Sequence, residues 1–411
     1  MGASPYPWLI VLAALAYVIL WREGAFRRNS TLFLSAALIL TAMALRGLCM
    51  EHETLDYQNF LAKWVQFYRD NGGVRALGRS IGNYNVPYLY FLALFSYCGM
   101  RDLYLIKLLS VGFDVLLAWA VFRLVRKVSG SDRAATAAFF ITLFLPTVVL
   151  NGAYWGQCDS IYGAFAVWSL AFALEHKPVR SMVSIALSFA FKLQAVFLMP
   201  VFLIFIFAKK IQWRHLPIFP LTYLVVVLPA VLAGRPLKDM ILLYFDQAGS
   251  VGSGLNYNSS SIYAFLSRDA RTEGLAGIGI AAAFLFLLLL FLLCFLRRRH
   301  LDAQALLACA VLISVAVPFF LPHMHDRYFF LADVLSVALA VTVPYLAIVP
   351  VCVSFGSLLG YHAYLRMRYL FPMRYGTAAL LTVIVILILW LTLYLSGKKA
   401  KKRLTNSDNL L

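Results

Sequence analysis

The sequence contains few charged residues, and most of them are basic. Only 13% of its 411 residues are charged, whereas 62% are apolar, and the mean hydropathy is +0.81. Such a composition excludes a soluble domain and predicts a polytopic membrane protein. Asp and Glu number 18 against 36 Lys and Arg, so the formal net charge is +18. The basic residues gather in short loops between apolar runs, a pattern that argues against a nucleic-acid partner and indicates cytoplasmic loops.

Cysteine is also scarce. The six cysteines form no CxxC pair and three of them lie in apolar runs, so we predict packing residues rather than a disulfide framework or a metal site. The N-terminus has no basic segment before its first apolar run and no small-residue cleavage site after it, so we expect this run to remain as an anchor. No internal repeat is apparent, which weighs against a transporter built from repeats.

Placing the basic clusters on the cytoplasmic side gives about 13 membrane spans, with the N-terminus outside and the C-terminal tail inside. Those clusters hold 20 of the 36 Lys and Arg residues. We therefore predict an all-α polytopic membrane protein, with one transmembrane domain over residues 1–397 and a basic cytoplasmic tail over residues 398–411. Long outer loops are expected over residues 49–102 and 234–273. In the first loop, the apolar run 86–98 is short for a span and predicts an interfacial or re-entrant helix.

The first polar stretch, residues 51–60, carries three carboxylates within six positions and follows two apolar runs. Because each run approaches the length needed to cross a bilayer core, these acids are expected at a membrane face. Asp56 is our candidate for the reacting group, since the residues from Phe60 onward predict an amphipathic helix that would hold it near the lipid headgroups. The alternative is a solvated, charged loop without chemistry.

Three further polar segments are predicted on the same side, namely residues 155–159, 192–194 and 323–327. Together with the first stretch they supply carboxylates, a lysine, two histidines and an arginine. This set suits an anionic substrate at the membrane surface, with a base to activate a nucleophile and cations to neutralise a phosphate leaving group. The His-x-His pair in the last segment also suggests a metal. Zinc sites normally gather three or more ligands, so we rank metal binding below phosphate binding.

Two charged residues lie deeper in the predicted bundle. Lys107 and Asp114 are seven positions apart in one apolar run and so share a face of its helix. Ionisable groups at such positions face the protein interior or a wet cavity. Structural pairing is the interpretation we favour for them, with a role in a functional cavity as the alternative.

Five motifs, in matching order, resemble one enzyme family. They are Leu55-Asp56-Tyr57-x-x-Phe60-Leu61-x-x-Trp64, Asn85-Val86-Pro87-Tyr88-Leu89-Tyr90, Trp155-Gly156-Gln157-x-Asp159-Ser160, Phe191-Lys192-Leu193-Gln194 and Met324-His325-Asp326-Arg327-Tyr328. The ordered set is similar to the polyprenyl-phosphate-sugar-dependent glycosyltransferases of the GT-C fold, especially bacterial mannosyltransferase-like proteins related to the second mannosyltransferase of GPI-anchor synthesis. More distantly, it resembles the dolichyl-phosphate-glucose enzymes of the N-glycan pathway. The resemblance covers roughly residues 31–345, and the apolar run 8–21 is an addition to the simplest family plan.

The resemblance implies a role for each matching residue. Asp56 would be the general base on an acceptor hydroxyl, with Glu53 as a second candidate, and the hydroxyl would displace polyprenyl phosphate with inversion. The leaving phosphate already carries charge, so cations near it would supply most of the stabilisation. These phosphate-binding residues would be Arg327, His325 and Lys192. The sugar and acceptor pocket would be lined by Asp159, Gln157, Trp155, Gln194 and His323. For Trp155, an interfacial belt residue is the alternative.

The implied activity is transfer of a single sugar, mannose or another hexose, from a polyprenyl-phosphate donor. The acceptor would be a hydroxyl of a lipid-linked glycan, a cell-envelope polymer or a protein, at the outer face of a bacterial cytoplasmic membrane. Membrane lipids are expected partners and nucleic acid is not. No cofactor is firmly implied, and dependence on a divalent metal stays open. Alternatives are a polymerase of lipid-linked glycans and a transporter or flippase for them, which would need charged residues through the middle of several spans.

Overall fold

A computed structural model describes residues 3–26, 29–249, 254–266 and 273–407 of the chain. In these residues the fold is almost entirely helical, as the composition predicts. Helices suit the apolar runs because a helix pairs its own backbone groups, which a lipid environment requires. The helices are α1 (Tyr6–Arg22), α2 (Asn29–Gly47), α3 (Ala62–Asp70), α4 (Val86–Phe95), α5 (Asp102–Ser129), α6 (Asp132–Phe144), α7 (Pro146–Val149), α8 (Asp159–Leu174), α9 (Pro178–Phe191), α10 (Val201–Phe207), α11 (Ile218–Leu232), α12 (Leu237–Gly249), α13 (Leu275–Leu296), α14 (Ala303–Phe320), α15 (Phe330–Thr342), α16 (Ile348–Leu365) and α17 (Arg374–Ser407).

Short irregular elements connect these helices. Two strands of two residues each, β1 (Asn256–Tyr257) and β2 (Met324–His325), pair in parallel. The π-helical turns are η1 (Tyr57–Leu61) and η3 (Leu150–Trp155), and the 3-10 turns are η2 (Gly73–Gly78), η4 (Leu193–Phe197), η5 (Trp213–His215), η6 (Ile262–Phe265), η7 (Arg298–His300) and η8 (Pro344–Leu346).

Six helical segments of the described chain are long and apolar enough to cross a membrane. A seventh forms if α6 and the helix from Pro146 to Trp155 count as one span, bent by 46°. The bend falls where Pro146 interrupts the helix, because proline donates no backbone hydrogen bond. The six are Asp102–Ser129, Trp213–Leu232, Leu275–Leu296, Ala303–Phe320, Pro344–Leu365 and Arg374–Gly397. Shorter apolar helices of 10–17 residues accompany them, and the total of about 13 spans stays a prediction.

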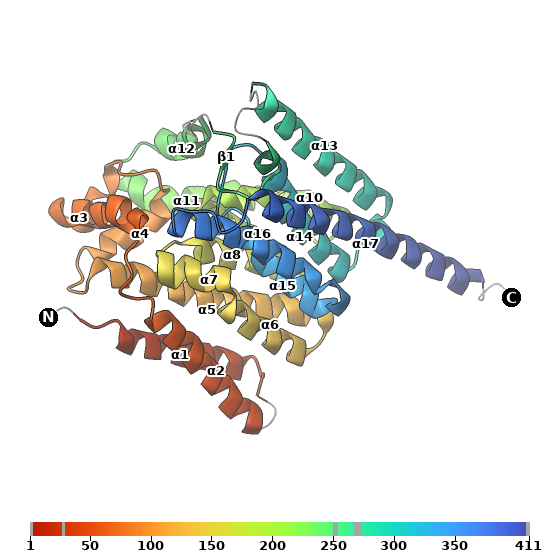
Figure 1. The fold of residues 1–411 in the computed structure, drawn as a ribbon, viewed down its shortest axis with the longest axis horizontal. Coiled ribbons are helices and arrows are strands. Elements are labelled where there is room, and N and C mark those ends of the chain that lie inside the picture. Colours follow the sequence, from red (N-terminus) through yellow and green to blue (C-terminus); the bar gives the residue numbers. More distant parts are fainter. Residues whose placement is uncertain (1–2, 27–28, 250–253, 267–272, 408–411) are drawn as a thin grey trace.

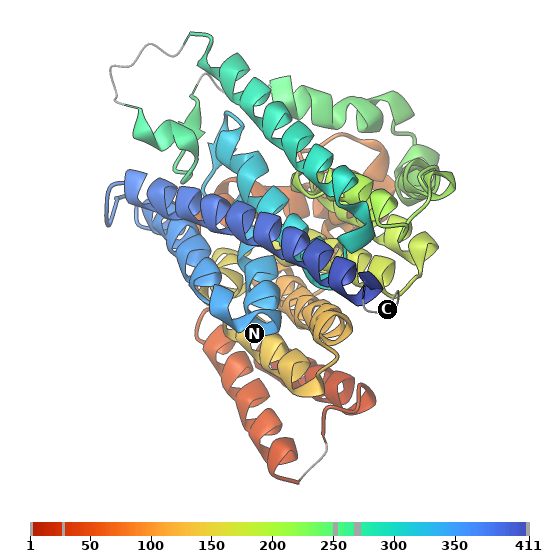
Figure 2. The same ribbon diagram turned by 90° about the vertical axis from the view of Figure 1, so that its right-hand side faces the viewer.

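The core of the bundle is built on α5, which packs against α6, α8 and α15, while α8 packs against α9. In α14, 83% of an apolar stretch of 18 residues is buried. In α13 the buried share of such a stretch is only 22%, so this helix turns most of its surface outward. Figure 1 shows α13 and α17 on one side of these central helices and the α1–α2 hairpin on the opposite side. In Figure 2 the same hairpin extends beyond the rest of the bundle.

The two deep charges do not pair with each other. Their Cα atoms are separated by two helical turns of α5, and each finds a partner from another segment. Asp114 Oδ2 lies 2.9 Å from Arg46 Nε of α2, and Asp114 Oδ1 accepts a 2.5 Å hydrogen bond from Ser160. Lys107 instead donates to the backbone carbonyls of Cys49 and His52, at 2.6 and 2.5 Å. The predicted structural pairing therefore exists for Asp114, with a different partner, while Lys107 secures the start of the first polar loop.

The two expected outer loops contain their own structure. Residues 49–102 hold α3, α4 and the turns η1 and η2, and α4 has only ten residues, too few for a straight span. Residues 234–273 hold α12, β1 and η6. Positions 250–253 and 267–272 of this second loop, and 408–411 of the expected tail, lie outside the described residues. Helix α17 continues without a break past residue 397, so membrane helix and basic tail form one element up to Ser407.

Candidate active site

Asp56 lies at the centre of a cluster of polar and aromatic side chains. Its Oδ2 accepts hydrogen bonds from Trp155 Nε1 at 2.9 Å and from Gln157 Nε2 at 2.6 Å, and its Oδ1 accepts one from the Tyr364 hydroxyl at 2.5 Å. Arg327 Nη1 is 3.7 Å from Oδ2. The carboxylate is 17% exposed. Three donors thus fix its orientation while one acceptor position on Oδ1 stays open.

The loop that carries Asp56 is tied to the helices beneath it. Lys107 binds its backbone carbonyls from below, as described above. The Thr54 hydroxyl donates to the carbonyl of Trp155 at 3.0 Å, and the ring of His52 stacks on Tyr154 with centroids 3.8 Å apart. Asp56 itself directly precedes the π-helical turn η1. The residues that precede the acid in the chain are therefore held by contacts with the helices.

The Trp155–Asp159 corner is shaped by a turn that only glycine adopts easily. Gly156 has φ +80° and ends the π-helical turn η3, so the chain reverses there and α8 begins at Asp159. The Gln157 carbonyl accepts a 2.7 Å hydrogen bond from Ser110 of α5. As a result, Trp155 and Gln157 both present side-chain N–H groups to Asp56.

Trp155 is fully buried. Tyr364 stacks on its ring at 4.7 Å, Tyr361 meets it edge to face at 5.4 Å, and the guanidinium of Arg327 lies over it at 5.1 Å. The alternative of an interfacial belt residue is wrong, because such a residue would be exposed to headgroups. Its sugar-stacking role stays a prediction, and the contact that the structure shows is with Asp56.

Asp159 and Lys192 form a buried ion pair. Asp159 also accepts a hydrogen bond from Asn151 Nδ2 at 2.6 Å, and it is 1% exposed. Lys192 follows the end of α9 in extended backbone and is 7% exposed. Its charge is therefore largely compensated before any ligand binds. Removing either partner would leave an uncompensated buried charge.

Arg327 is the cation that three carboxylates surround. It lies in the turn between β2 and α15, 3.7 Å from Asp56, 3.8 Å from Asp159 and 4.0 Å from Asp326. All three distances exceed a hydrogen bond, and its Nε has no hydrogen-bond partner in the described part of the chain. A guanidinium has five N–H donors in a planar fork that matches phosphate oxygens. Arg327 thus keeps donors for an anion.

Burial and nearby charges set the protonation of His325 and Asp326, the two residues that precede Arg327 in the chain. Burial raises the pKa of Asp326 to about 7, and Asp56 and Asp159 act in the same direction against the nearby Arg327. Burial, with Arg327 and Lys192 nearby, lowers the pKa of His325 to about 4. At neutral pH the His325 imidazole is therefore uncharged and can offer a phosphate a hydrogen bond but no charge.

The remaining predicted pocket residues lie around this centre. His325 stacks on Tyr257 of β1 with centroids 4.8 Å apart, because the two residues pair in the β1–β2 register. His323 Nδ1 lies 2.7 Å from the carbonyl of Gly254. Gln194 hydrogen-bonds the hydroxyl of Tyr328. The loop of residues 234–273 is thereby attached beside Arg327, and the sugar-binding roles of His323 and Gln194 stay predictions.

Glu53 lies in a different set of contacts from Asp56. It forms an ion pair with Arg101 and accepts a 2.8 Å hydrogen bond from Gln58. Arg101 also lies 3.3 Å from Glu51, at a largely exposed rim. Of the two candidate bases, Asp56 is the one that the structure brings to Trp155, Gln157 and Arg327.

Sequence reasoning missed several members of the cluster. Tyr364 and Tyr361 come from α16, beyond the residues that carry the family resemblance, and Asn151 bridges Asp159 and Tyr361. Tyr84 donates to Gln157 Oε1 at 3.3 Å, and Lys192 lies over its ring. The available signal was the Gly-Tyr-His-Ala-Tyr end of an apolar helix, where two tyrosines three positions apart share one face.

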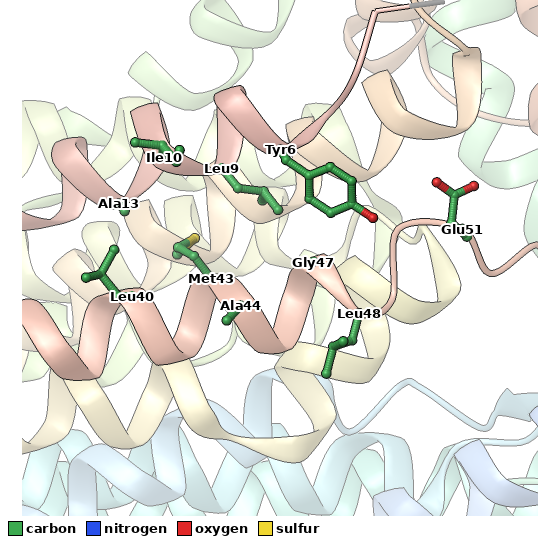
Figure 3. A pocket seen from close by; sticks show the side chains of 10 residues that line it. All are labelled: Tyr6, Leu9, Ile10, Ala13, Leu40, Met43, Ala44, Gly47, Leu48 and Glu51. Atoms are coloured by element: carbon green, nitrogen blue, oxygen red, sulfur yellow. The ribbon is translucent and has the colours of Figure 1, made fainter.

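Two apolar cavities lie elsewhere, beside the N-terminal hairpin. One, of about 480 Å³, runs between α1 and α2, and among its lining residues only Glu51 is charged (Figure 3). The other, of about 730 Å³, is bounded by α1, α4 and α5 and contains no charged side chain in its lining. Neither has the cations that a phosphate needs. In the described residues, no group of three or more His, Cys, Asp and Glu side chains is arranged to hold a metal ion.

The fold and this cluster define a helical membrane protein with an acid and an arginine side by side in an aromatic enclosure. The model of glycosyltransferase family 87 matches residues 84–318, more than half of the chain. The protein therefore belongs to glycosyltransferase family 87 and is a membrane glycosyltransferase. The matched range includes Trp155, Gln157, Asp159 and Lys192, whereas Asp56 precedes it and Arg327 follows it. No curated protein matches the chain.

Proposed function

We propose that the protein is an inverting GT-C-type glycosyltransferase that uses a polyprenyl-phosphate sugar. It moves one sugar, mannose or another hexose, to a hydroxyl of a lipid-linked glycan, a cell-envelope polymer or a protein. The observation that carries the proposal is the pairing of Asp56 with Arg327, 3.7 Å apart in one partly exposed cluster. A base beside an anion-binding arginine is the minimum that displacement of a phosphate by an alcohol requires.

The geometry around Asp56 supports its role as the base. The acceptor hydroxyl donates to the open position on Oδ1, and the carboxylate takes its proton as the oxygen attacks the anomeric carbon. The bond from that carbon to the phosphate oxygen breaks, and the electron pair leaves with the phosphate. Because Trp155, Gln157 and Tyr364 already orient Asp56, little reorganisation is needed when the proton moves.

The unused N–H donors of Arg327 support its role as the residue that binds the phosphate. The leaving group gains negative charge as the glycosidic bond breaks, and a preorganised guanidinium in a water-poor site stabilises such charge strongly. Lys192 contributes less, since Asp159 compensates it. His325, uncharged at neutral pH, contributes a hydrogen bond.

The membrane setting supports a lipid-linked donor. The site lies where α8, α16 and the first polar loop meet, in a helical bundle whose candidate membrane spans include helices with exposed apolar side chains. Two polar loops that are expected on the outer side, residues 49–102 and 234–273, both reach this site. We therefore propose that catalysis occurs at the outer face of a bacterial cytoplasmic membrane.

The direct test is incubation of the purified protein with single donors, with release of lipid phosphate as the readout. Polyprenyl-phosphate mannose, polyprenyl-phosphate glucose and the matching sugar nucleotides are compared, each with a lipid-linked acceptor. The proposal predicts turnover with a polyprenyl-phosphate sugar and none with a sugar nucleotide. Turnover that depends on a sugar nucleotide would place the protein in a different mechanistic class.

A further inference from the structure

A second arginine, Arg235, is buried and has no counter-charge among the described residues. It is 3% exposed, directly follows the turn that ends α11, and forms no ion pair within the described part of the chain. Its Nε and Nη1 have no hydrogen-bond partner there. Its one side-chain hydrogen bond runs from Nη2 to Ser80 Oγ, at 3.2 Å.

The other buried basic side chains of the described residues are all compensated. Arg46 pairs with Asp114, Lys192 pairs with Asp159, and Lys107 donates to backbone carbonyls. An arginine stays charged at any physiological pH, and burying its charge without a partner is costly. Among the buried cations of the described residues, Arg235 is therefore the one whose charge a bound anion would balance.

The surroundings of Arg235 are neutral hydrogen-bonding groups. Tyr68 of α3 is fully buried, its hydroxyl has no hydrogen-bond partner in the described residues, and it lies within electrostatic range of the guanidinium. Gly78 allows the two segments that enclose Arg235 to approach closely, because a Cβ at this position would lie 2.0 Å from the carbonyl oxygen of Ala233. The end of η2 and the end of α11 are thus in close contact around Arg235.

This position is close to the surface. Ser80, which accepts from Arg235, is exposed, and so are the basic residues Arg75 and Arg79 on the same segment. Lys238 and Asp239, next along the chain, are both exposed and carry opposite charges. A small displacement of Ser80 would open the guanidinium to an anion, and the basic rim would favour its approach.

The adjoining surface is one that a lipid chain fits. Leu221, Val225, Leu228 and Leu232 of α11 are 61%, 67%, 46% and 79% exposed. Their spacing places them on one face of a candidate membrane span, and Arg235 follows three residues after the last of them. An apolar strip that ends at an uncompensated arginine matches a lipid chain with an anionic headgroup.

We propose that Arg235, with Ser80 and Tyr68, binds the phosphate group of a lipid whose chain lies along the exposed face of α11. A phosphate offers acceptors to Nε, Nη1 and the Tyr68 hydroxyl, the three donors that lack partners, and its charge balances the guanidinium. The site is separate from Arg327 and does not depend on sugar transfer.

The test is lipid binding by the purified full-length protein in a phosphate-free detergent, followed by native mass spectrometry. Dioleoyl phosphatidic acid is compared with dioleoylglycerol, which lacks the phosphate, and with inorganic phosphate. Wild type is expected to bind phosphatidic acid and not dioleoylglycerol. Arg235→Gln should weaken the binding about tenfold, as loss of a charge-assisted hydrogen-bond pair does.

Three further variants keep the result interpretable. Arg214→Gln removes an exposed arginine at the opposite end of the α11 segment, and it should leave the affinity within about twofold. Ser80→Ala and Tyr68→Phe are milder changes at the site, and each should weaken binding severalfold. They test the site even if Arg235→Gln does not fold. Measurement in an Arg327→Gln background separates this site from the one proposed for the donor.

Equal affinity of wild type and Arg235→Gln for phosphatidic acid, or equal binding of dioleoylglycerol, would overturn the proposal. Binding of inorganic phosphate as tight as that of phosphatidic acid would overturn the assignment to a lipid. Loss of binding in Arg327→Gln with no effect of Arg235→Gln would reject this site while leaving the proposed function in place.

Discussion

The charge of the site depends on one proton held by Asp326. When this residue is neutral, Asp56 and Asp159 are the carboxylates that balance Lys192 and Arg327, and an incoming phosphate meets no excess negative charge. When Asp326 ionises, a third carboxylate lies 4.0 Å from Arg327. With its pKa at about 7, the change falls within the physiological range. Ionisation of Asp326 therefore opposes binding of a second anion.

The first prediction concerns donor binding as a function of pH. Between pH 6 and 8, wild type should lose affinity for the donor, with the apparent KM rising on the order of fivefold for about 1 kcal/mol of lost attraction. Asp326→Asn stays neutral and should show a flat KM over this range. A wild-type KM that does not change, or the same rise in Asp326→Asn, would refute this account of Asp326.

The same residue links stability to pH with a defined sign. Its pKa is about 7 when folded, against about 3.9 in an unfolded chain. Between these values the folded protein retains a proton that the unfolded chain has released. Its contribution to the free energy of unfolding therefore falls as pH rises from about 4 to 7. Asp326→Asn should remove that part of the pH dependence in thermal unfolding.

At the scale of elements, the buried pair Arg46–Asp114 joins α2 to α5 and, through Ser160, to α8. Both side chains are fully buried. Asp114→Ala should lower the free energy of unfolding by about 3–5 kcal/mol, because it leaves the Arg46 charge uncompensated. Thermal unfolding in detergent measures this loss. The double variant Arg46→Met with Asp114→Leu should recover most of it, and a double variant as unstable as the single one would contradict the explanation.

Lys107 is a positioning residue that acts through the polar loop. It is expected to affect catalysis although it lies on α5 and its ammonium donates to backbone carbonyls of the loop rather than to Asp56. Lys107→Met should lower kcat by roughly tenfold to a hundredfold, as misplacement of a catalytic group by about 1 Å does, with a smaller change in donor KM. Steady-state kinetics separates the two constants. A variant with normal kcat and a raised KM would show that Lys107 serves binding instead.

The elements also show what the sequence can predict and what it cannot. Apolar runs predict the helices because lipid leaves the backbone few alternatives, and the polar breaks at Asp56, Trp155 and Arg327 mark where those helices end. The partners of Lys107 and Asp114 could not be predicted, since helical periodicity places residues on a face of one helix but does not say which neighbouring segment covers it. Tyr364 was missed for the same reason.

At the scale of the whole molecule, segments far apart in the sequence meet at one place. Asp56 and Tyr364 are separated by 308 positions and share a hydrogen bond of 2.5 Å. The ordered motifs predicted that such segments belong to one site. The number of spans, by contrast, depends on how bent and short helices are counted, and hydrophobic length alone does not decide it. The family match covers residues 84–318, whereas Asp56 and Arg327, the two residues proposed for the chemistry, lie outside that range.

The central claim is that Asp56 and Arg327 form one reaction centre, with Asp56 as its base. The most direct measurement is release of lipid phosphate from the donor by Asp56→Asn, with Glu53→Gln as the matched control on the same loop. Asp56→Asn should bind the donor yet turn over at least about a hundredfold more slowly, while Glu53→Gln should stay within a few fold of wild type. Normal turnover by Asp56→Asn, or the large loss in Glu53→Gln instead, would contradict the account.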